Sequence, residues 1–197
     1  MICTVLDGLF DPVYLHQIDS LVRDIPLCTN NIANRKTYPY GTEGTHRLMG
    51  QILFNREDLN TITTLKPECE DFFKILKVIE KELNAYFYCS QITVNVQHSG
   101  CDGTTHVDSP DPNDYTILLF SCATWNQEWG GQFQLCTPDG EVVEEHEYIP
   151  GRVILVPSKH PHRGLGPTEP YVYRSSVAFR VTPLDYHLRK NYQGHDA

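Results

Sequence analysis

The sequence predicts a mostly β fold in which a jelly-roll core is supported by N-terminal helices. Residues 1–90 contain two stretches with apolar residues at helical spacing. Residues 91–182 instead hold short β-branched or aromatic runs that Gly and Pro separate, with no helical pattern between them. Many short strands in series are typical of a β-sandwich or barrel. We expect a single domain over residues 1–197, with helical support in 1–90, the jelly-roll core in 91–182 and a polar tail in 183–197.

The N-terminal elements follow from local signals. Residues 2–6 read as a strand, and Asp11 followed by Pro12 is typical of an N-cap with proline at the first helical position. Residues 26–45 are rich in Asn, Thr, Gly and Pro, which predicts a long loop, and residues 46–54 read as a strand. A second helix is expected from Pro67, with acidic residues in its first turn and a buried face of Cys69, Phe72, Phe73, Leu76, Ile79 and Leu83.

The C-terminal strands are expected where apolar runs lie between turn residues. These runs are residues 92–96, 115–122, 132–135, 152–156 and 171–181. The polar run from Asp185 to Ala197 is expected to be a frayed tail, with His187 and His195 at the surface.

The composition favours some functions over others. The chain has 197 residues, of which 40% are hydrophobic, and a formal net charge of −9. Negative charge opposes binding to a phosphate backbone, so nucleic acid is not an expected partner. No run reaches the roughly 18 apolar residues of a membrane span, and the first residues lack the features of a signal peptide. Seven cysteines without a CxxC pair fit reduced thiols and a cytoplasmic location.

A possible metal site begins with His106 and Asp108. Residues two apart on an extended chain project from the same face, although an isolated His-x-Asp is more often part of a surface loop. One further histidine would complete a set of two histidines and one carboxylate, which holds Fe(II) and leaves coordination positions open. His160 and His162 both follow the apolar run 152–156, and strand parity does not choose between them because they too are two apart.

Arg174 interrupts a run, 171–179, that is otherwise apolar, aromatic or small. A guanidinium in such a strand needs a partner, either an internal acidic residue or the carboxylate of a ligand that its fork can bind through two bonds. Ser176 lies two residues further on and can face the same site.

Four motifs, in the correct order, resemble the 2-oxoglutarate- and Fe(II)-dependent dioxygenases, and in particular their prolyl-hydroxylase-like branch. Gln97, Gly100, Gly103, His106 and Asp108 have the spacing of the branch's YxxGxxYxxHxD signature. The segment 125–135 (WNQEWGGQFQL) resembles its Trp-Gly-Gly turn and strand, and 150–158 (PGRVILVPS) resembles the run before its distal histidine. Arg174, twelve residues beyond His162, is the fourth. Together these motifs cover residues 92–181.

The resemblance implies a double-stranded β-helix and a set of site residues. His106, Asp108 and His162, favoured over His160 by its flanking residues, would bind Fe(II). Arg174 would pair with the distal carboxylate of 2-oxoglutarate and Ser176 would hydrogen-bond it, with Thr116 and Asn95 as further cosubstrate-binding candidates. The implied reaction uses O2, with ascorbate as a supporting reductant, to hydroxylate a C–H bond and release succinate and CO2. The loop 26–45, with Gly41 to Gly44, would be a lid.

The substrate is less defined, because Gln97 and Gly103 replace both signature tyrosines. The branch implies a prolyl residue in a peptide or protein, while a free amino acid or small metabolite is an alternative. Arg174 and Arg180, six apart, and Asn95 also resemble the nucleic-acid dealkylating branch, but the Trp-Gly-Gly motif and the acidic charge oppose it. A binding or structural domain with an inactive metal site is the non-enzymatic alternative.

Overall fold

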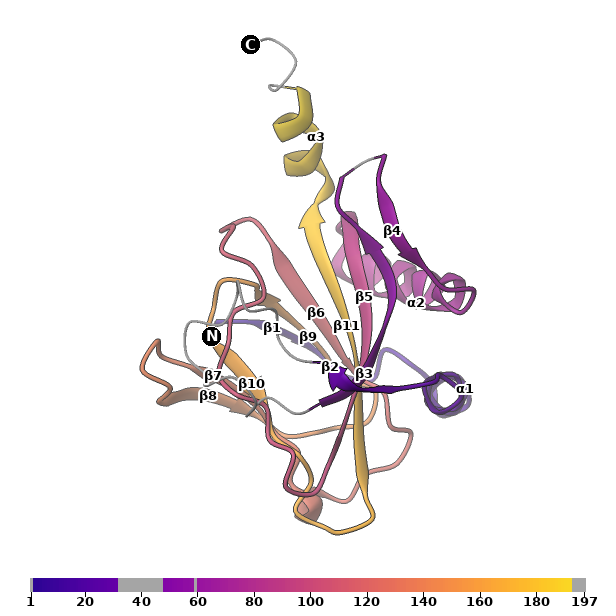
Figure 1. Cartoon of the computed structure of the whole chain (residues 1–197), viewed down its shortest axis with the longest axis vertical. Coiled ribbons are helices and arrows are strands. Elements are labelled where there is room, and N and C mark those ends of the chain that lie inside the picture. The colour runs from indigo at the N-terminus through magenta and orange to yellow at the C-terminus, as the bar shows by residue number, and fades with distance from the viewer. Residues whose placement is uncertain (1, 32–47, 59, 193–197) are drawn as a thin grey trace.

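The computed structural model describes residues 2–31, 48–58 and 60–192 and consists of two antiparallel sheets, with two helices on one side and a third beyond the end of the last strand (Figure 1). The eight-stranded sheet has the order β1-β9-β6-β11-β5-β3-β2, and β4 pairs with β3 beside this path. Its strands are β1 (Thr4–Leu6), β2 (Cys28–Asn31), β3 (Leu48–Arg56), β4 (Ile62–Leu65), β5 (Phe87–His98), β6 (Tyr115–Phe120), β9 (Val153–Pro157) and β11 (Tyr173–Pro183). The smaller sheet has the order β10-β7-β8, with β7 (Phe133–Cys136), β8 (Val142–His146) and β10 (His162–Gly164).

Two helices cover the face of the large sheet that points away from the small sheet (Figure 1). In α1 (Pro12–Arg23), the Asp11 side chain accepts a hydrogen bond from the backbone N–H of Tyr14 at 2.9 Å, as expected of an N-cap. The second helix, α2 (Cys69–Leu83), begins two residues after Pro67. Both helices bury an apolar stripe against the sheet, made of Leu15, Ile18 and Val22 in α1 and Phe72, Ile75, Leu76 and Ile79 in α2.

A second apolar cluster fills the space between the two sheets. It includes Phe120 from β6, Phe133 and Leu135 from β7, and Tyr148, whose ring stacks on Phe120 with 4.5 Å between centroids. The predicted fold class, a mostly β jelly roll supported by helices, is confirmed. Residues 1–90 also supply strands to the large sheet, since β3 pairs with β5 along its length.

Some local predictions are wrong. Residues 28–31, placed in a loop by their polar character, form β2, because backbone pairing with β3 outweighs the weak strand propensity of Asn. Residues 185–192, which belong to the run expected to be frayed, lie in α3 (Leu184–Tyr192). The His187 ring stacks on Tyr88, with centroids 3.6 Å apart, so this histidine is anchored to β5. The strands β4, β8 and β10 were not predicted. The rest of the proposed lid, from residue 32, and His195 lie outside the described residues.

No helix in the described part of the chain has the length and apolar character needed to span a membrane.

Strand register places one row of side chains from β5 and β11 in the same pocket. Four antiparallel pairs are in register: Arg174 with Gln97, Ser176 with Asn95, Ala178 with Thr93 and Arg180 with Gln91. Because paired residues share a face and residues two apart alternate back to it, all eight side chains line one cavity. This row is the floor of the site described next.

Candidate active site

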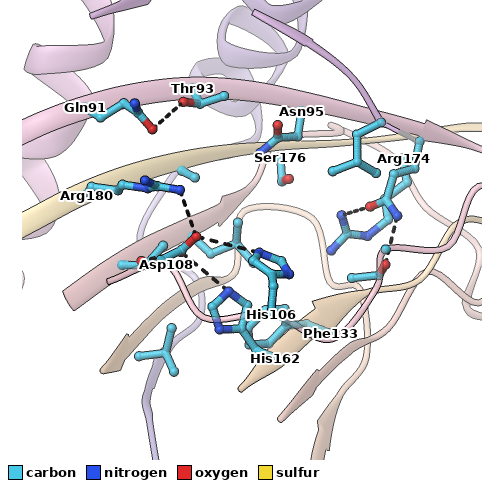
Figure 2. A pocket seen from close by; sticks show the side chains of 18 of the residues that line it. Gln91, Thr93, Asn95, His106, Asp108, Phe133, His162, Arg174, Ser176 and Arg180 are labelled. Carbon is cyan, nitrogen blue, oxygen red and sulfur yellow. Dashed lines mark hydrogen bonds and ion pairs between the residues drawn. The ribbon is translucent and has the colours of Figure 1, made fainter. Parts of the chain in front are cut away.

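His106, Asp108 and His162 form a compact group in which one ligand atom of each residue lies within 4.8 Å of the others. The Nε2 atom of His106 is 3.7 Å from Asp108 Oδ1, and the Nε2 atom of His162 is 3.5 Å from Asp108 Oδ2 (Figure 2). The two imidazole rings lie 4.6 Å apart between centroids. Two imidazole nitrogens and one carboxylate are a donor set that suits Fe(II) and other first-row divalent metals.

Backbone pairing brings the two histidines together. His106 and His162 form an isolated antiparallel bridge, with N–H···O distances of 3.0 and 2.9 Å in the two directions. The Nδ1 atoms lie 2.8 Å from the carbonyl oxygens of Thr104 and His160, respectively. A carbonyl oxygen only accepts, so each Nδ1 carries a proton, and each Nε2 is the ring nitrogen that faces Asp108 and is left to bind a metal. This is the arrangement that orients histidines as metal ligands.

The Asp108 carboxylate is buried and held by two neighbours. Thr116 donates from Oγ1 to Oδ2 at 2.6 Å, and Arg180 donates from Nη2 to Oδ1 at 3.0 Å. Burial by itself would raise the pKa of Asp108, but Arg180 and the two histidines outweigh it and hold this pKa well below its usual range. Burial likewise opposes a charged His162, yet Asp108 outweighs it, so the pKa of His162 is raised. The carboxylate is therefore ionised and available to a cation.

His160 does not join this group. Its side chain is outside the set of donor atoms around Asp108, and burial, followed by the nearby His162, lowers its pKa. The contribution of His160 is its backbone carbonyl, which accepts from His162 Nδ1. Of the two histidines that the sequence left open, the structure brings His162 to His106 and Asp108.

Arg174 is a buried cation at the other end of the pocket (Figure 2). Only 2% of it is exposed, and burial lowers its pKa. Its Nε donates to the carbonyl of Gly131 and its Nη1 to Oε1 of Gln97, both at 2.8 Å. The third nitrogen, Nη2, is buried and has no hydrogen-bond partner among the described residues. No acidic side chain in the described ranges pairs with this guanidinium.

A buried arginine without a counter-charge is costly, and the surrounding residues make room for it. The guanidinium lies over the rings of Phe120 and Tyr148, 5.2 Å from each centroid, where cation–π attraction recovers part of the cost. A Cβ atom on Gly164 would come within 3.3 Å of both Nη1 and Nη2. The orphaned Nη2 and this space fit a ligand carboxylate, which would supply both the missing charge and the missing acceptor.

The pocket that joins these two ends has a volume of about 230 Å³. Ser176 and Asn95 line it between Arg174 and the histidines (Figure 2). Thr116 also lines it, and the contacts of its hydroxyl are with Asp108 and with Ser158 at 2.9 Å. Thus the residues to which the resemblance gives a role in binding iron or 2-oxoglutarate all line a single pocket: His106, Asp108, His162, Arg174, Ser176, Thr116 and Asn95.

Two residues with clear roles in this pocket were not assigned them from the sequence. In the sequence Arg180 stands out only by its spacing from Arg174, whereas in the structure its guanidinium holds Asp108. In the sequence Gln97 stands out only as the replacement of a tyrosine. In the structure its Oε1 accepts from Arg174, and its Nε2 donates to the carbonyls of Cys101 and Gly164 at 2.9 and 2.8 Å. Alternation along the strands could have indicated both residues. Gln97 lies two residues from Asn95 and Arg180 lies six residues from Arg174, so each faces the same side of its strand as a predicted pocket residue.

Comparisons with known proteins agree with this geometry at the level of the fold. No family model matches the chain, and no curated protein matches it. Among solved structures, the chain is similar to a 2OG-Fe(II) oxygenase family oxidoreductase from Burkholderia pseudomallei, with a TM-score of 0.64 and 16% identity over 92% of this chain and 85% of that one. It is also similar to a prolyl-4-hydroxylase from Pseudomonas putida (TM-score 0.61, 15% identity, 92% of each chain). A third similar structure is a Trichoplax adhaerens prolyl hydroxylase in complex with a hypoxia inducible factor peptide fragment. Its TM-score is 0.60, with 14% identity over 95% of this chain and 86% of that one. The chain therefore has the fold of the 2-oxoglutarate/Fe(II) oxygenases, as the sequence motifs implied.

Proposed function

We propose that the chain, as a single domain over residues 1–197, is an Fe(II)- and 2-oxoglutarate-dependent dioxygenase that hydroxylates a C–H bond. The observation that carries this proposal is the shared pocket. A triad with metal-ligand geometry lies at one end, and a buried guanidinium with an unpartnered nitrogen lies at the other. A general metal site would not need the buried arginine, and an anion site would not need the triad.

The residues would divide the work as follows. His106, Asp108 and His162 would hold Fe(II) and leave positions open for other ligands. Arg174 would bind the distal carboxylate of 2-oxoglutarate through Nη2, and Ser176 and Asn95 would line its carbon chain. Thr116 and Arg180 keep Asp108 ionised and oriented. When bound, iron and 2-oxoglutarate supply the oxidising chemistry that inserts one atom of O2 into a C–H bond, with release of succinate and CO2.

For the substrate, we propose a prolyl residue in a peptide or protein. The motifs of the prolyl-hydroxylase-like branch support this, as does the similarity to two prolyl hydroxylase structures. A free amino acid or small metabolite is the second candidate, because Gln97 and Gly103 replace the signature tyrosines and Gln97 is engaged with Arg174. A nucleic-acid substrate is disfavoured by the net charge of −9 and by the engagement of Arg180 with Asp108.

The test is an assay with Fe(II), 2-oxoglutarate, O2 and ascorbate, offered proline-rich peptides, free amino acids and a methylated oligonucleotide in separate reactions. We expect succinate and a mass gain of one oxygen on one class of substrate. His106→Ala should abolish both, while His16→Ala, on the exposed side of α1, should leave them unchanged. Binding of metal and 2-oxoglutarate without any succinate would instead indicate the non-enzymatic alternative.

The cytoplasmic location of the protein stays a prediction. It is supported by the cysteines, since all seven are free thiols.

A further inference from the structure

A second group of metal-ligating side chains lies outside the pocket. Cys3, Glu144 and His146 place one ligand atom each within 4.8 Å of the others. The Cys3 sulfur is 3.2 Å from His146 Nε2 and 3.6 Å from Glu144 Oε1. The His146 Nε2 and Glu144 Oε1 atoms are 3.2 Å from each other. None of the three residues lines the candidate active site.

The group joins the edges of the two sheets. Cys3 directly precedes β1, an edge strand of the large sheet, while Glu144 and His146 lie on β8, an edge strand of the small sheet. Glu144 and His146 are two apart on β8 and so share a face. Backbone pairing holds β8 to β7 and β1 to β9, so the three side chains come from independently fixed strands.

We propose that Cys3, Glu144 and His146 bind a divalent transition metal of the zinc class and thereby connect β1 to β8. The bond lengths of zinc put the edges of its coordination tetrahedron at roughly 3.3–3.7 Å. The separation of 3.6 Å between Cys3 and Glu144 lies within this range, and the two separations of 3.2 Å are slightly shorter than it. A thiolate together with an imidazole selects zinc or a similar metal over Mg²⁺ and Ca²⁺, which prefer oxygen ligands.

The carboxylate of Glu144 is held by a hydrogen bond that does not use its ligand atom. The backbone N–H of Ile2 donates to Glu144 Oε2 at 3.0 Å, which leaves Oε1 facing Cys3 and His146. Cys3 is 7% exposed, and the side chains of His146 and Glu144 are 12% and 21% exposed. The group is thus sheltered but reachable from solvent, and water would supply the fourth ligand of the metal.

Cobalt(II) distinguishes this site from the triad. A cobalt–thiolate bond gives an intense near-ultraviolet charge-transfer band, and none of His106, Asp108 and His162 contains sulfur. We expect the band when the full-length protein is titrated with Co(II), and displacement of the band by Zn(II). Cys3→Ser and His146→Ala should each lose the band and bind one equivalent less metal, while His106→Ala should keep it.

Cys101→Ser is the matched control. The Cys101 sulfur also lies beside a histidine, 3.1 Å from His98 Nε2, but this pair has no third donor among the described residues. We expect the band to be unchanged in Cys101→Ser. Absence of the band in the wild-type protein, or its persistence in Cys3→Ser, would overturn the proposal and leave a hydrogen-bonded cluster without metal.

Thermal unfolding gives a second, independent measurement. In the His106→Ala/His162→Ala protein, which lacks the triad, Zn(II) should still raise the melting temperature because it binds the folded state. The same increase should be absent when Cys3→Ser is added. If Zn(II) raised the melting temperature equally in both proteins, the stabilising ion would bind elsewhere and the proposal would be wrong.

Discussion

Thr116 donates a 2.6 Å hydrogen bond to Oδ2 of Asp108, from the interior strand β6 to the carboxylate of the triad. The same hydroxyl lies 2.9 Å from the hydroxyl of Ser158, and both groups are buried. Asp108 itself follows β5 in a connecting segment, so this contact attaches a loop carboxylate to the rigid sheet. The orientation of the Asp108 carboxylate toward the two histidines therefore depends on Thr116, which would not touch the metal.

Replacement of Thr116 by valine tests this dependence. Thr116→Val preserves shape and removes the hydroxyl, so Asp108 keeps its charge but loses one of its two side-chain donors. Loss of such an outer contact typically weakens metal binding by about 10–100-fold. We expect a decrease of this size in Mn(II) affinity, measured by isothermal titration calorimetry. Thr93→Val is the control, because Thr93 lines the same pocket and bonds Gln91 instead. Equal affinities in the two variants would contradict the role given to Thr116.

Arg174→Lys tests the cosubstrate end of the pocket. Lysine keeps the positive charge but loses the planar fork, along with the bonds that the guanidinium makes to Gly131 and Gln97. We expect the dissociation constant for 2-oxoglutarate, measured in the presence of Mn(II), to rise about tenfold or more, which corresponds to at least about 1.4 kcal/mol. The affinity for Mn(II) alone should not change.

Arg163→Lys is the matched control for this substitution. Arg163 lies on β10 and donates from Nε to Gln134 at 2.7 Å, without lining the pocket. We expect its 2-oxoglutarate affinity to equal that of the wild-type protein. An unchanged affinity in Arg174→Lys would show that Arg174 does not bind the cosubstrate.

Gly164→Ala tests the space around the guanidinium. A methyl group here would lie 3.1 Å from Gln97 Oε1 and 3.3 Å from both Nη atoms of Arg174, where we place the ligand carboxylate. The backbone of Gly164 is not left-handed, so alanine introduces no backbone strain, and only the side chains of Gln97 and Arg174 would have to shift by a few tenths of an ångström. We expect weaker 2-oxoglutarate binding at nearly unchanged Mn(II) affinity. A variant that bound 2-oxoglutarate normally would show that the carboxylate lies elsewhere.

The part of this site that the sequence predicts depends on alternation along strands. Arg174 and Ser176 were placed together because residues two apart share a face, and the pairing of β11 with β5 agrees. The same alternation extends to Arg180, but its contact with Asp108 depends on the path of the chain between β5 and β6. No local pattern describes that path, so the role of Arg180 required the structure.

The choice between His160 and His162 has a similar origin. Both have the same strand parity, so only the resemblance of the flanking residues favours His162 in the sequence. The structure adds the bridge between His162 and His106, which joins residues 56 positions apart. Strands β2 and β8 were missed for another reason: both are short, and each is largely polar or exposed. Such strands are stabilised by backbone pairing with a neighbour rather than by a buried face, and sequence periodicity reports only the latter.

The edge of the large sheet carries an ion pair that predicts a pH-dependent stability. Asp7, just after β1, accepts two 2.8 Å hydrogen bonds from Nε and Nη2 of Arg152, just before β9. Arg152 lowers the pKa of the Asp7 carboxyl. A lowered pKa in the folded state means that the stabilisation is fully present above the unfolded pKa, about 3.9, and is lost as the pH falls through the folded value.

We therefore expect Asp7→Asn to lower the free energy of unfolding near neutral pH, by at most about 1 kcal/mol because the Asp7 side chain is half exposed. The difference from wild type should shrink as the pH is lowered to about 3. Urea unfolding at both pH values measures this difference, and the Arg152→Met background is the control, since Asp7→Asn should have little effect when its partner is absent. A difference that grew toward acid pH, or that persisted in Arg152→Met, would assign the stability of this edge to packing rather than to the ion pair.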